Sequence, residues 1–175
     1  MPLAAPNPAS VSPGGYVTGA LWNANVYNGL TFLANKPLFI GIQTVVQSVA
    51  NGTWQVLTFD TETIDTYGGH STVSNTSRYT CQLAGWYRIA GRAAFAVNGT
   101  GSRGCRVHLN ANYIQGAATL TGAGTLMGIP EVTHTLYLNV GDYVELAGGQ
   151  NSGGSLSTAY VNEGASMMYV IWEHA

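Results

Sequence analysis

The chain has 175 residues, which is enough for one all-β domain with an extension and a proper hydrophobic core. Charged residues make up only 8% of it, against about a quarter in an average globular protein, so we expect part of the surface to be buried against other copies. The net charge is −2 and the only lysine is Lys36, which excludes the basic patch of a nucleic-acid-binding protein. Neither a secretory leader nor a membrane-spanning apolar run is recognisable.

The N-terminal part, residues 1–41, is predicted to be an extended arm followed by one short helix. Met1–Gly15 holds four of the six prolines and few large apolar residues. Thr18 is the expected N-cap, and Asn35 and Pro37 mark the end of the helix. The helix has an apolar stripe at i, i+4, i+8 and i+11, formed by Trp22, Val26, Leu30 and Leu33. This stripe either packs on the β-domain or docks the chain on a larger assembly.

Residues 42–175 are predicted to form a ten-stranded jelly-roll sandwich, because period-2 patterns recur with turn signals about every 8–12 residues. Gly85–Val97 is the expected central strand, and Asn51–Gly52 is a strong hairpin signal. Asp60–Ser77 is expected to be a long surface loop with a short edge strand around Ser71–Val73, and Thr119–Pro130 is expected to be a loop. The other strands are expected at Thr44–Val49, Trp54–Phe59, Arg78–Leu83, Cys105–Asn110, Tyr113–Ala118, Val132–Val140, Tyr143–Ala147, Leu156–Val161 and Ala165–Glu173.

The last strand is apolar on both faces, whereas a strand in a two-layer sandwich normally shows one face to water. One face carries Met167, Tyr169 and Ile171, and the other carries Met168, Val170 and Trp172. We therefore expect a symmetry-related subunit to cover it, in a homotrimer. The predicted interface residues are Met168, Tyr169, Val170 and Trp172. The alternative is that the helix containing Trp22 provides the cover.

Three segments resemble the globular head of complement component q and its tumour-necrosis-factor-like relatives. They are GWYRIAGRAAF at residues 85–95, LNVGDYVEL at residues 138–146, and the closing apolar strand that ends near Trp172. The resemblance covers residues 42–175. It implies a ten-stranded jelly roll that assembles as a trimer.

Two longer runs are similar to small virion proteins of tailed bacteriophages that infect actinobacteria, usually classed as minor tail proteins. The runs are ALWNANVYNGLTFL at residues 20–33 and WQVLTFDTETIDTYGGHSTVSNTSRYTCQLAGWY at residues 54–87. This similarity implies a head displayed on a virion by its N-terminal segment, with other virion proteins and a host surface glycan as partners. The chain lacks a collagen repeat and a fibre shaft, so capsid decoration fits as well as a tail appendage.

No catalytic or cofactor-binding residue is predicted, and we do not expect an enzyme. Gly99, Gly101 and Gly104 spell G-x-G-x-x-G, but no helix is expected after them to meet a pyrophosphate. Cys105 and His108 are three residues apart on a strand and therefore point to opposite faces. A carbohydrate-binding module and a polysaccharide depolymerase remain as alternative functions.

No metal site is predicted in the acidic loop. Asp60, Glu62, Asp65 and His70 could serve a calcium ion, but their spacing does not match an EF-hand, and a solvated acidic loop is the favoured interpretation. The two cysteines, Cys81 and Cys105, are expected to be reduced core residues, with a single disulfide as the alternative. The loops Tyr67–Ser77, Thr119–Pro130 and Gly148–Gly154 are candidates for carbohydrate or protein contact through exposed aromatic rings, but buried core aromatics are the favoured interpretation.

Overall fold

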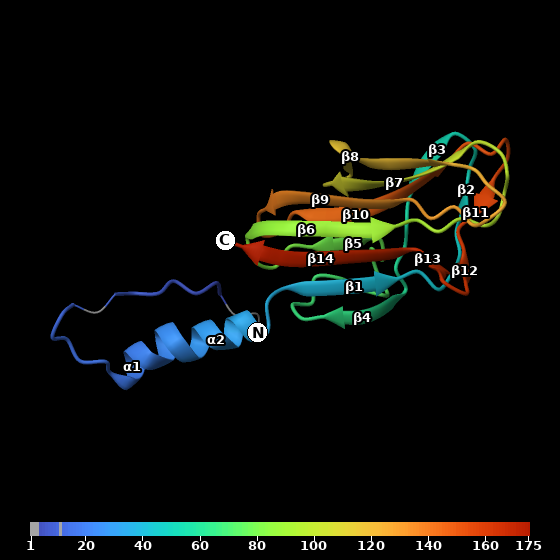
Figure 1. Cartoon of the computed structure of the whole chain (residues 1–175). Helices are drawn as coiled ribbons and strands as arrows, with labels where there is room; N and C mark the ends of the chain where they lie inside the picture. Colours follow the sequence, from blue (N-terminus) through green and yellow to red (C-terminus); the bar gives the residue numbers. More distant parts are fainter. Residues whose placement is uncertain (1–3, 11) are drawn as a thin grey trace.

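The computed structural model describes residues 4–10 and 12–175, which form a β-sandwich head and a helix with its arm (Figure 1). Residues 1–3 and Val11 of the predicted arm lie outside the described residues. The helix is continuous and consists of α1 (Gly19–Trp22), the π-helical segment η1 (Asn23–Tyr27) and α2 (Asn28–Ala34). Both predicted boundaries are confirmed: the Thr18 hydroxyl accepts a hydrogen bond from the Leu21 N–H, and Asn35 is the C-cap.

The arm runs back along the helix, and Asn25 of η1 fixes it there (Figure 1). The Asn25 amide donates to the Leu21 carbonyl at 3.0 Å, and its oxygen accepts from the Ala9 N–H at 2.7 Å. Pro6 packs against Gly29 one turn further on. The arm therefore covers one side of the helix and leaves the opposite side open to solvent.

Two five-stranded antiparallel sheets form the head and confirm the predicted ten-stranded sandwich. The first sheet has the order β4 (Thr61–Asp65), β1 (Leu38–Ile42), β14 (Met167–His174), β6 (Gly85–Arg92) and β9 (Glu131–Leu138). The second has the order β3 (Thr53–Val56), β10 (Tyr143–Gln150), β7 (Ser102–Leu109) and β8 (Asn112–Gly122), with β5 (Arg78–Thr80) also paired to β10. Two short pairs complete the head: β2 (Ser48–Val49) with β11 (Leu156–Ser157), and β12 (Tyr160–Val161) with β13 (Gly164–Ala165).

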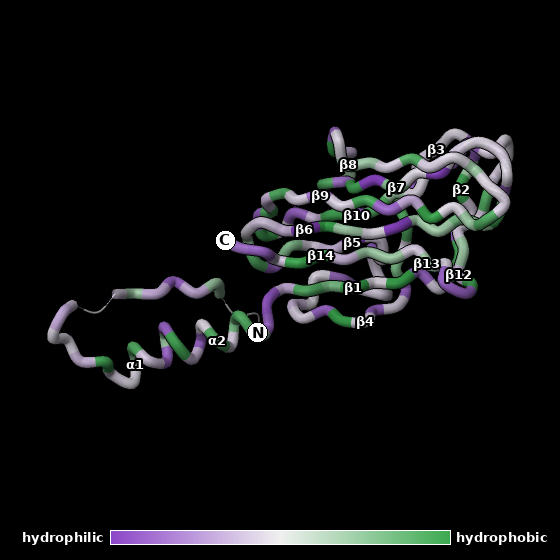
Figure 2. The backbone as a smooth tube through the Cα atoms, in the orientation of Figure 1, coloured by the Kyte–Doolittle hydropathy of each residue, from purple (hydrophilic) through white to green (hydrophobic). Residues whose placement is uncertain are grey.

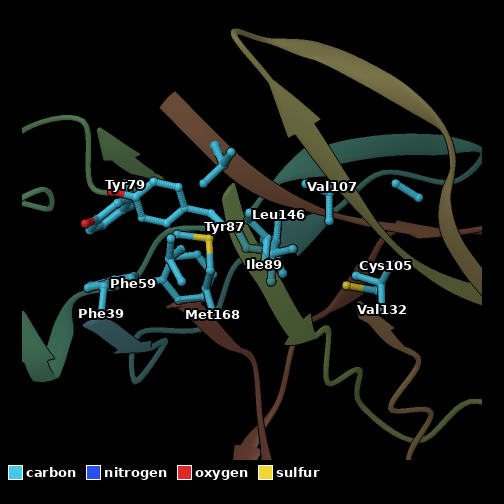
Figure 3. Close-up of a cluster of buried hydrophobic side chains, with 14 of the residues drawn as sticks. Phe39, Phe59, Tyr79, Tyr87, Ile89, Cys105, Val107, Val132, Leu146 and Met168 are labelled. Atoms are coloured by element: carbon cyan, nitrogen blue, oxygen red, sulfur yellow. The ribbon is translucent and has the colours of Figure 1, made fainter. Parts of the chain in front are cut away.

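Alternate residues of both sheets meet in a single core (Figure 3). Ile89 and Met168 come from the first sheet and Val107 and Leu146 from the second, and all four are fully buried. This alternation follows from the pleat, which turns successive side chains to opposite faces. Cys81 and Cys105 are buried and unbridged, as the favoured interpretation of the sequence has it.

The head begins at Leu38 rather than at Ile42, because β1 pairs with β14 from Leu38 opposite Ile171 onward. The central strand β6 ends at Arg92, short of Val97, and the chain then leaves the sheet through bridges from Phe95 to Gly128 and Thr158.

Three local predictions differ from the structure. The expected loop Asp60–Ser77 contains the edge strand β4 at Thr61–Asp65, whereas no strand forms around Ser71–Val73, where a short one is expected. Only Ser48–Val49 of the strand expected at Thr44–Val49 is extended in a sheet. Asn51–Gly52 does form a turn, but β2 before it pairs with β11 and β3 after it pairs with β10. A turn signal reports local backbone conformation and not the partner of the strands that it joins.

Candidate functional site

One half of the outer surface of the first sheet is a continuous apolar patch. On β14, Met167, Tyr169 and Ile171 point outward, opposite Ile42, Ile40 and Leu38 of β1. Ile64 of the edge strand β4 extends the patch beside Ile40. We call these seven residues the apolar sheet face: Leu38, Ile40, Ile42, Ile64, Met167, Tyr169 and Ile171. They are partly or fully accessible in the single chain, so the patch is available to a partner.

The other half of this surface, on β6 and β9, is aromatic and carries paired charges. Trp86 and Tyr137 lie opposite each other with their rings edge-to-face at 5.9 Å. The Arg88 guanidinium is 3.0 Å from the Glu173 carboxylate, and Arg92 is 4.0 Å from Glu131. Each arginine here already has a carboxylate, so a partner that covers this surface meets no uncompensated cation.

The predicted interface residues are not all on this surface. Met168 and Val170 are 0% exposed and Trp172 is 6% exposed, because their side chains point into the sandwich. That part of the prediction is wrong, since it drew residues from both faces of a strand of which only one can meet a partner. Tyr169 is the one predicted residue on the apolar sheet face. The alternation through Tyr169 would have identified Met167 and Ile171 from the sequence.

The helix leaves the head at one end and extends away from the sheets (Figure 1). Phe32 packs edge-on against Trp172 with ring centroids 5.1 Å apart, and the Lys36 ammonium lies 5.8 Å from the centre of the same indole. The alternative in which the helix covers the outer face of β14 is therefore not what the structure has. Instead, a hollow at the junction, lined in part by Leu33, Leu38 and Ile171, joins the helix to the apolar sheet face.

Three of the four predicted docking residues are exposed on the helix. Trp22, Leu30 and Leu33 are 55%, 62% and 60% exposed, whereas Val26 is partly buried. Val26, Leu30 and Leu33 all line a hollow between the helix and the arm. Hydrophobic and hydrophilic residues alternate along this helix (Figure 2). The exposed apolar stripe has no cover within the part of the chain that the structure describes.

The acidic residues of the expected loop are used to hold the backbone. Asp60 accepts hydrogen bonds from the N–H groups of Thr44 and Val45 at 2.8 and 2.6 Å. Burial alone would raise the pKa of Asp60, but these bonds outweigh it and lower the pKa below the ordinary value. Asp65 accepts from the N–H groups of three following residues, Tyr67, Gly68 and His70.

Glu62 is paired with His70, whose Nδ1 lies 2.7 Å from the carboxylate. Within residues 4–10 and 12–175, no group of three or more His, Cys, Asp or Glu side chains is arranged to hold a metal ion. The described helices are also too short or too polar to span a bilayer.

The candidate nucleophiles and the glycine motif have structural roles. Burial raises the pKa of Cys105 to about 12, and His108 lies on the opposite face of β7, as its spacing predicts. The glycine-containing loop is followed by a strand and encloses the buried Arg103, which donates to three loop carbonyls, those of Asn98, Thr100 and Ser102.

Comparison with protein-family models finds no match, and comparison with curated proteins finds no relative. Solved structures do match. The globular domain of zebrafish complement 1qA has a TM-score of 0.58 at 14% identity, over 80% of this chain and 100% of that one. Murine APRIL has a TM-score of 0.55 at 9% identity, over 77% and 98%. Eiger TNF from S. frugiperda has a TM-score of 0.54 at 13% identity, over 79% and 92%.

Identities this low support the fold and nothing finer. The match nevertheless spans nearly the whole of each solved domain and about four fifths of this chain, which corresponds to the head without the arm and helix. The chain therefore has the jelly-roll fold of complement-q and tumour-necrosis-factor-like domains.

Proposed function

We propose that this chain is a non-enzymatic attachment protein, a homotrimer of jelly-roll heads held on a bacteriophage virion by the arm and helix. The apolar sheet face is the observation that supports a trimer. Full burial of a Leu, Ile or Met side chain is worth about 1.5–3 kcal/mol, and these side chains are only partly covered in the single chain. Self-association through this face, with the neighbouring charges already paired, is the economical way to bury it.

The helix supports the anchoring role. Its exposed residues Trp22, Leu30 and Leu33 belong to the helix that extends away from the head (Figure 1), where they can contact another virion protein. The virion context itself rests on the sequence similarity to small phage virion proteins at residues 20–33 and 54–87.

Two locations on the particle fit this proposal, a minor tail appendage that contacts the host and a decoration protein on the capsid. A helix from Gly19 to Ala34 is roughly 24 Å long, at 1.5 Å per residue. A head joined to a helix of this length fits capsid decoration, which is the second candidate.

The trimer is tested by light scattering after size-exclusion chromatography of the full chain. We expect three times the chain mass of 18.4 kDa. Tyr169→Glu places a charge in the apolar sheet face and should give monomers. Gln115→Glu adds the same charge to an exposed position on β8 of the other sheet and should remain trimeric. A trimer from Tyr169→Glu would refute the assignment of the interface.

The virion role is tested by electron microscopy of intact particles with a gold-labelled antibody against the head. Label at the distal tail would support host recognition, and label over the capsid would support decoration. Particles that carry no label, although the antibody binds the isolated protein, would refute the virion role.

A further inference from the structure

The outer surface of the second sheet carries the Trp54 indole and the side chains around it, which we call the aromatic seat. This surface belongs to neither the proposed trimer interface nor the anchoring helix. The Trp54 indole, from β3, lies directly over Gly149 of β10 and Gly104 of β7. A Cβ at either glycine would overlap the ring. The two glycines therefore allow the indole to lie flat on the sheet, in one row with Leu120 of β8.

Arg106 of β7 reaches over this indole from the next row of the sheet. Its guanidinium carbon is 4.4 Å from the centre of the Trp54 ring and 5.5 Å from that of Tyr113 on β8. Its Nε donates to Nε2 of His108 at 2.8 Å. The described residues provide no acceptor for the two terminal nitrogens of Arg106. The bond from Nε therefore fixes the guanidinium, and its terminal N–H groups remain free to bind a ligand.

The neighbouring groups keep this cation uncompensated. His108 is buried, and burial together with Arg106 lowers the pKa of His108, so the imidazole stays neutral and Nε2 accepts. The Glu145 carboxylate is already bound by the Ser77 hydroxyl at 2.7 Å and by Arg78 Nε at 3.2 Å. Glu145 is thus committed to Arg78, and Arg106 has no carboxylate partner among the described residues.

A hollow of about 280 Å³ adjoins the Trp54 indole at the end of β7 where Ser102 lies. Trp54 and Leu120 form apolar parts of its wall, and Ser102 and Asn151 form polar parts. The Asn151 oxygen accepts from the Ser102 hydroxyl at 3.0 Å, while its amide nitrogen has no partner in the described chain. The Trp54 indole forms part of the wall of this hollow and is also the ring over which the Arg106 guanidinium lies.

We propose that this site binds an acidic sugar, with the sugar ring in the hollow against Trp54 and its oxyanion on the two terminal nitrogens of Arg106. A planar guanidinium binds a carboxylate or a phosphate through two parallel, charge-assisted hydrogen bonds. A neutral sugar has no anionic group to accept them. The apolar wall that Trp54 and Leu120 give the hollow suits the apolar face of a sugar ring. This inference names the ligand class of the proposed host attachment and rests on that function.

Titration calorimetry of the full-length wild-type protein at low salt tests the proposal with four probes. Glucuronic acid and glucose 6-phosphate distinguish carboxylate from phosphate as the preferred oxyanion, trigalacturonic acid tests an extended chain, and maltotriose is the uncharged control. We expect at least one acidic probe to bind at least tenfold more tightly than maltotriose. Equal binding of maltotriose, or no binding of any acidic probe, would overturn the proposal.

Two matched substitutions locate the site. Arg106→Lys keeps the charge but loses the planar fork, and it should weaken binding of the preferred acidic probe about tenfold. Arg78→Lys makes the same change at the arginine of this sheet that Glu145 neutralises, and binding should stay within twofold. Both variants should melt close to the wild type. Unchanged binding by Arg106→Lys, or an equal loss in Arg78→Lys, would refute the assignment to Arg106.

The binding and virion experiments together distinguish a failure of this inference from a failure of the proposed function. A trimer that is present on virions but binds no acidic probe would refute the ligand class alone. A chain that binds glucuronic acid through Arg106 but is absent from virions would refute the virion role and retain the site.

Discussion

Met168→Ala is the sharpest test of which face of β14 is buried. Met168 is 0% exposed, and its neighbours on the adjacent strands are Gly41 and Gly91, which have no side chains. Phe39 of the same strand and Phe59 lie over Gly41, and Leu146 of the opposite sheet lies over Gly91. The two positions directly opposite Met168 therefore have no side chain that could fill the space left by truncation.

Truncation removes three heavy atoms from this core. Met→Ala changes at buried sites cost about 2–5 kcal/mol of unfolding free energy, and the upper half of that range is expected where the surroundings cannot collapse. For a chain of this size, 1 kcal/mol lowers the melting temperature by about 2–4 °C, so a loss of roughly 3.5–5 kcal/mol corresponds to about 7–20 °C. The mass of the assembly should not change, because Met168 does not reach the outer surface.

The assay is urea unfolding, monitored by tryptophan fluorescence at two protein concentrations. Light scattering measures the mass of the assembly. Tyr169→Ala is the matched control on the outer face: it should weaken assembly, so its unfolding midpoint should depend more strongly on concentration than that of the wild type. The face assignment would be refuted if Met168→Ala melted like the wild type, or if it gave monomers while Tyr169→Ala stayed trimeric.

Two further outcomes follow from burial and hydrogen bonding. Cys105 should resist a thiol reagent at pH 8 in the native protein and react on unfolding, because burial raises its pKa to about 12; rapid native labelling would contradict this. Asp60 has a lowered pKa in the folded state, so its hydrogen bonds from Thr44 and Val45 stabilise the fold above the unfolded pKa of about 3.9 and are lost as the pH falls below it. Asp60→Asn should therefore lose less stability between pH 6 and pH 3 than the wild type does, and an identical loss would assign this acid sensitivity to other groups.

The features of this protein that depend on local periodicity can be predicted from its sequence. Turns and alternation identify the sandwich, and Thr18 and Asn35 bound the helix because caps are local chemistry. The π-helical segment Asn23–Tyr27 has no signal of its own, since apolar spacing does not distinguish a widened turn from an α-helical one. β4 was missed because the edge strand TETID has a single large apolar residue, Ile64.

The functional surfaces depend on pairing between strands, which periodicity does not encode. Both faces of β14 are apolar, so only the contact of Met168 with the opposite sheet decides which face is inside. The Trp54 seat needs Gly104 and Gly149, which are 45 residues apart in the chain (149 − 104) and become neighbours only through the pairing of β7 with β10. Arg106 looks like an ordinary strand residue until that register is known.

The two surfaces together predict how binding strength depends on assembly. In a trimer that buries the apolar sheet face, the second sheet of each subunit faces outward, so three Arg106 sites are presented at once. Linked sites on a polymer can raise avidity about 10²–10⁴-fold over a single site without any new contact. A weak single-site affinity would therefore suffice for tight binding to a surface that displays many acidic sugars.

Tyr169→Glu separates these contributions, because it lies on the other sheet from Arg106 and should give folded monomers. We expect it to bind glucuronic acid in solution within twofold of the wild type but to lose at least a hundredfold in apparent affinity for a surface coated with polygalacturonate. Arg106→Lys should lose affinity in both assays. If the Tyr169→Glu monomer held the coated surface as tightly as the wild type, the three sites would not act together, and the link between trimer and attachment would be wrong.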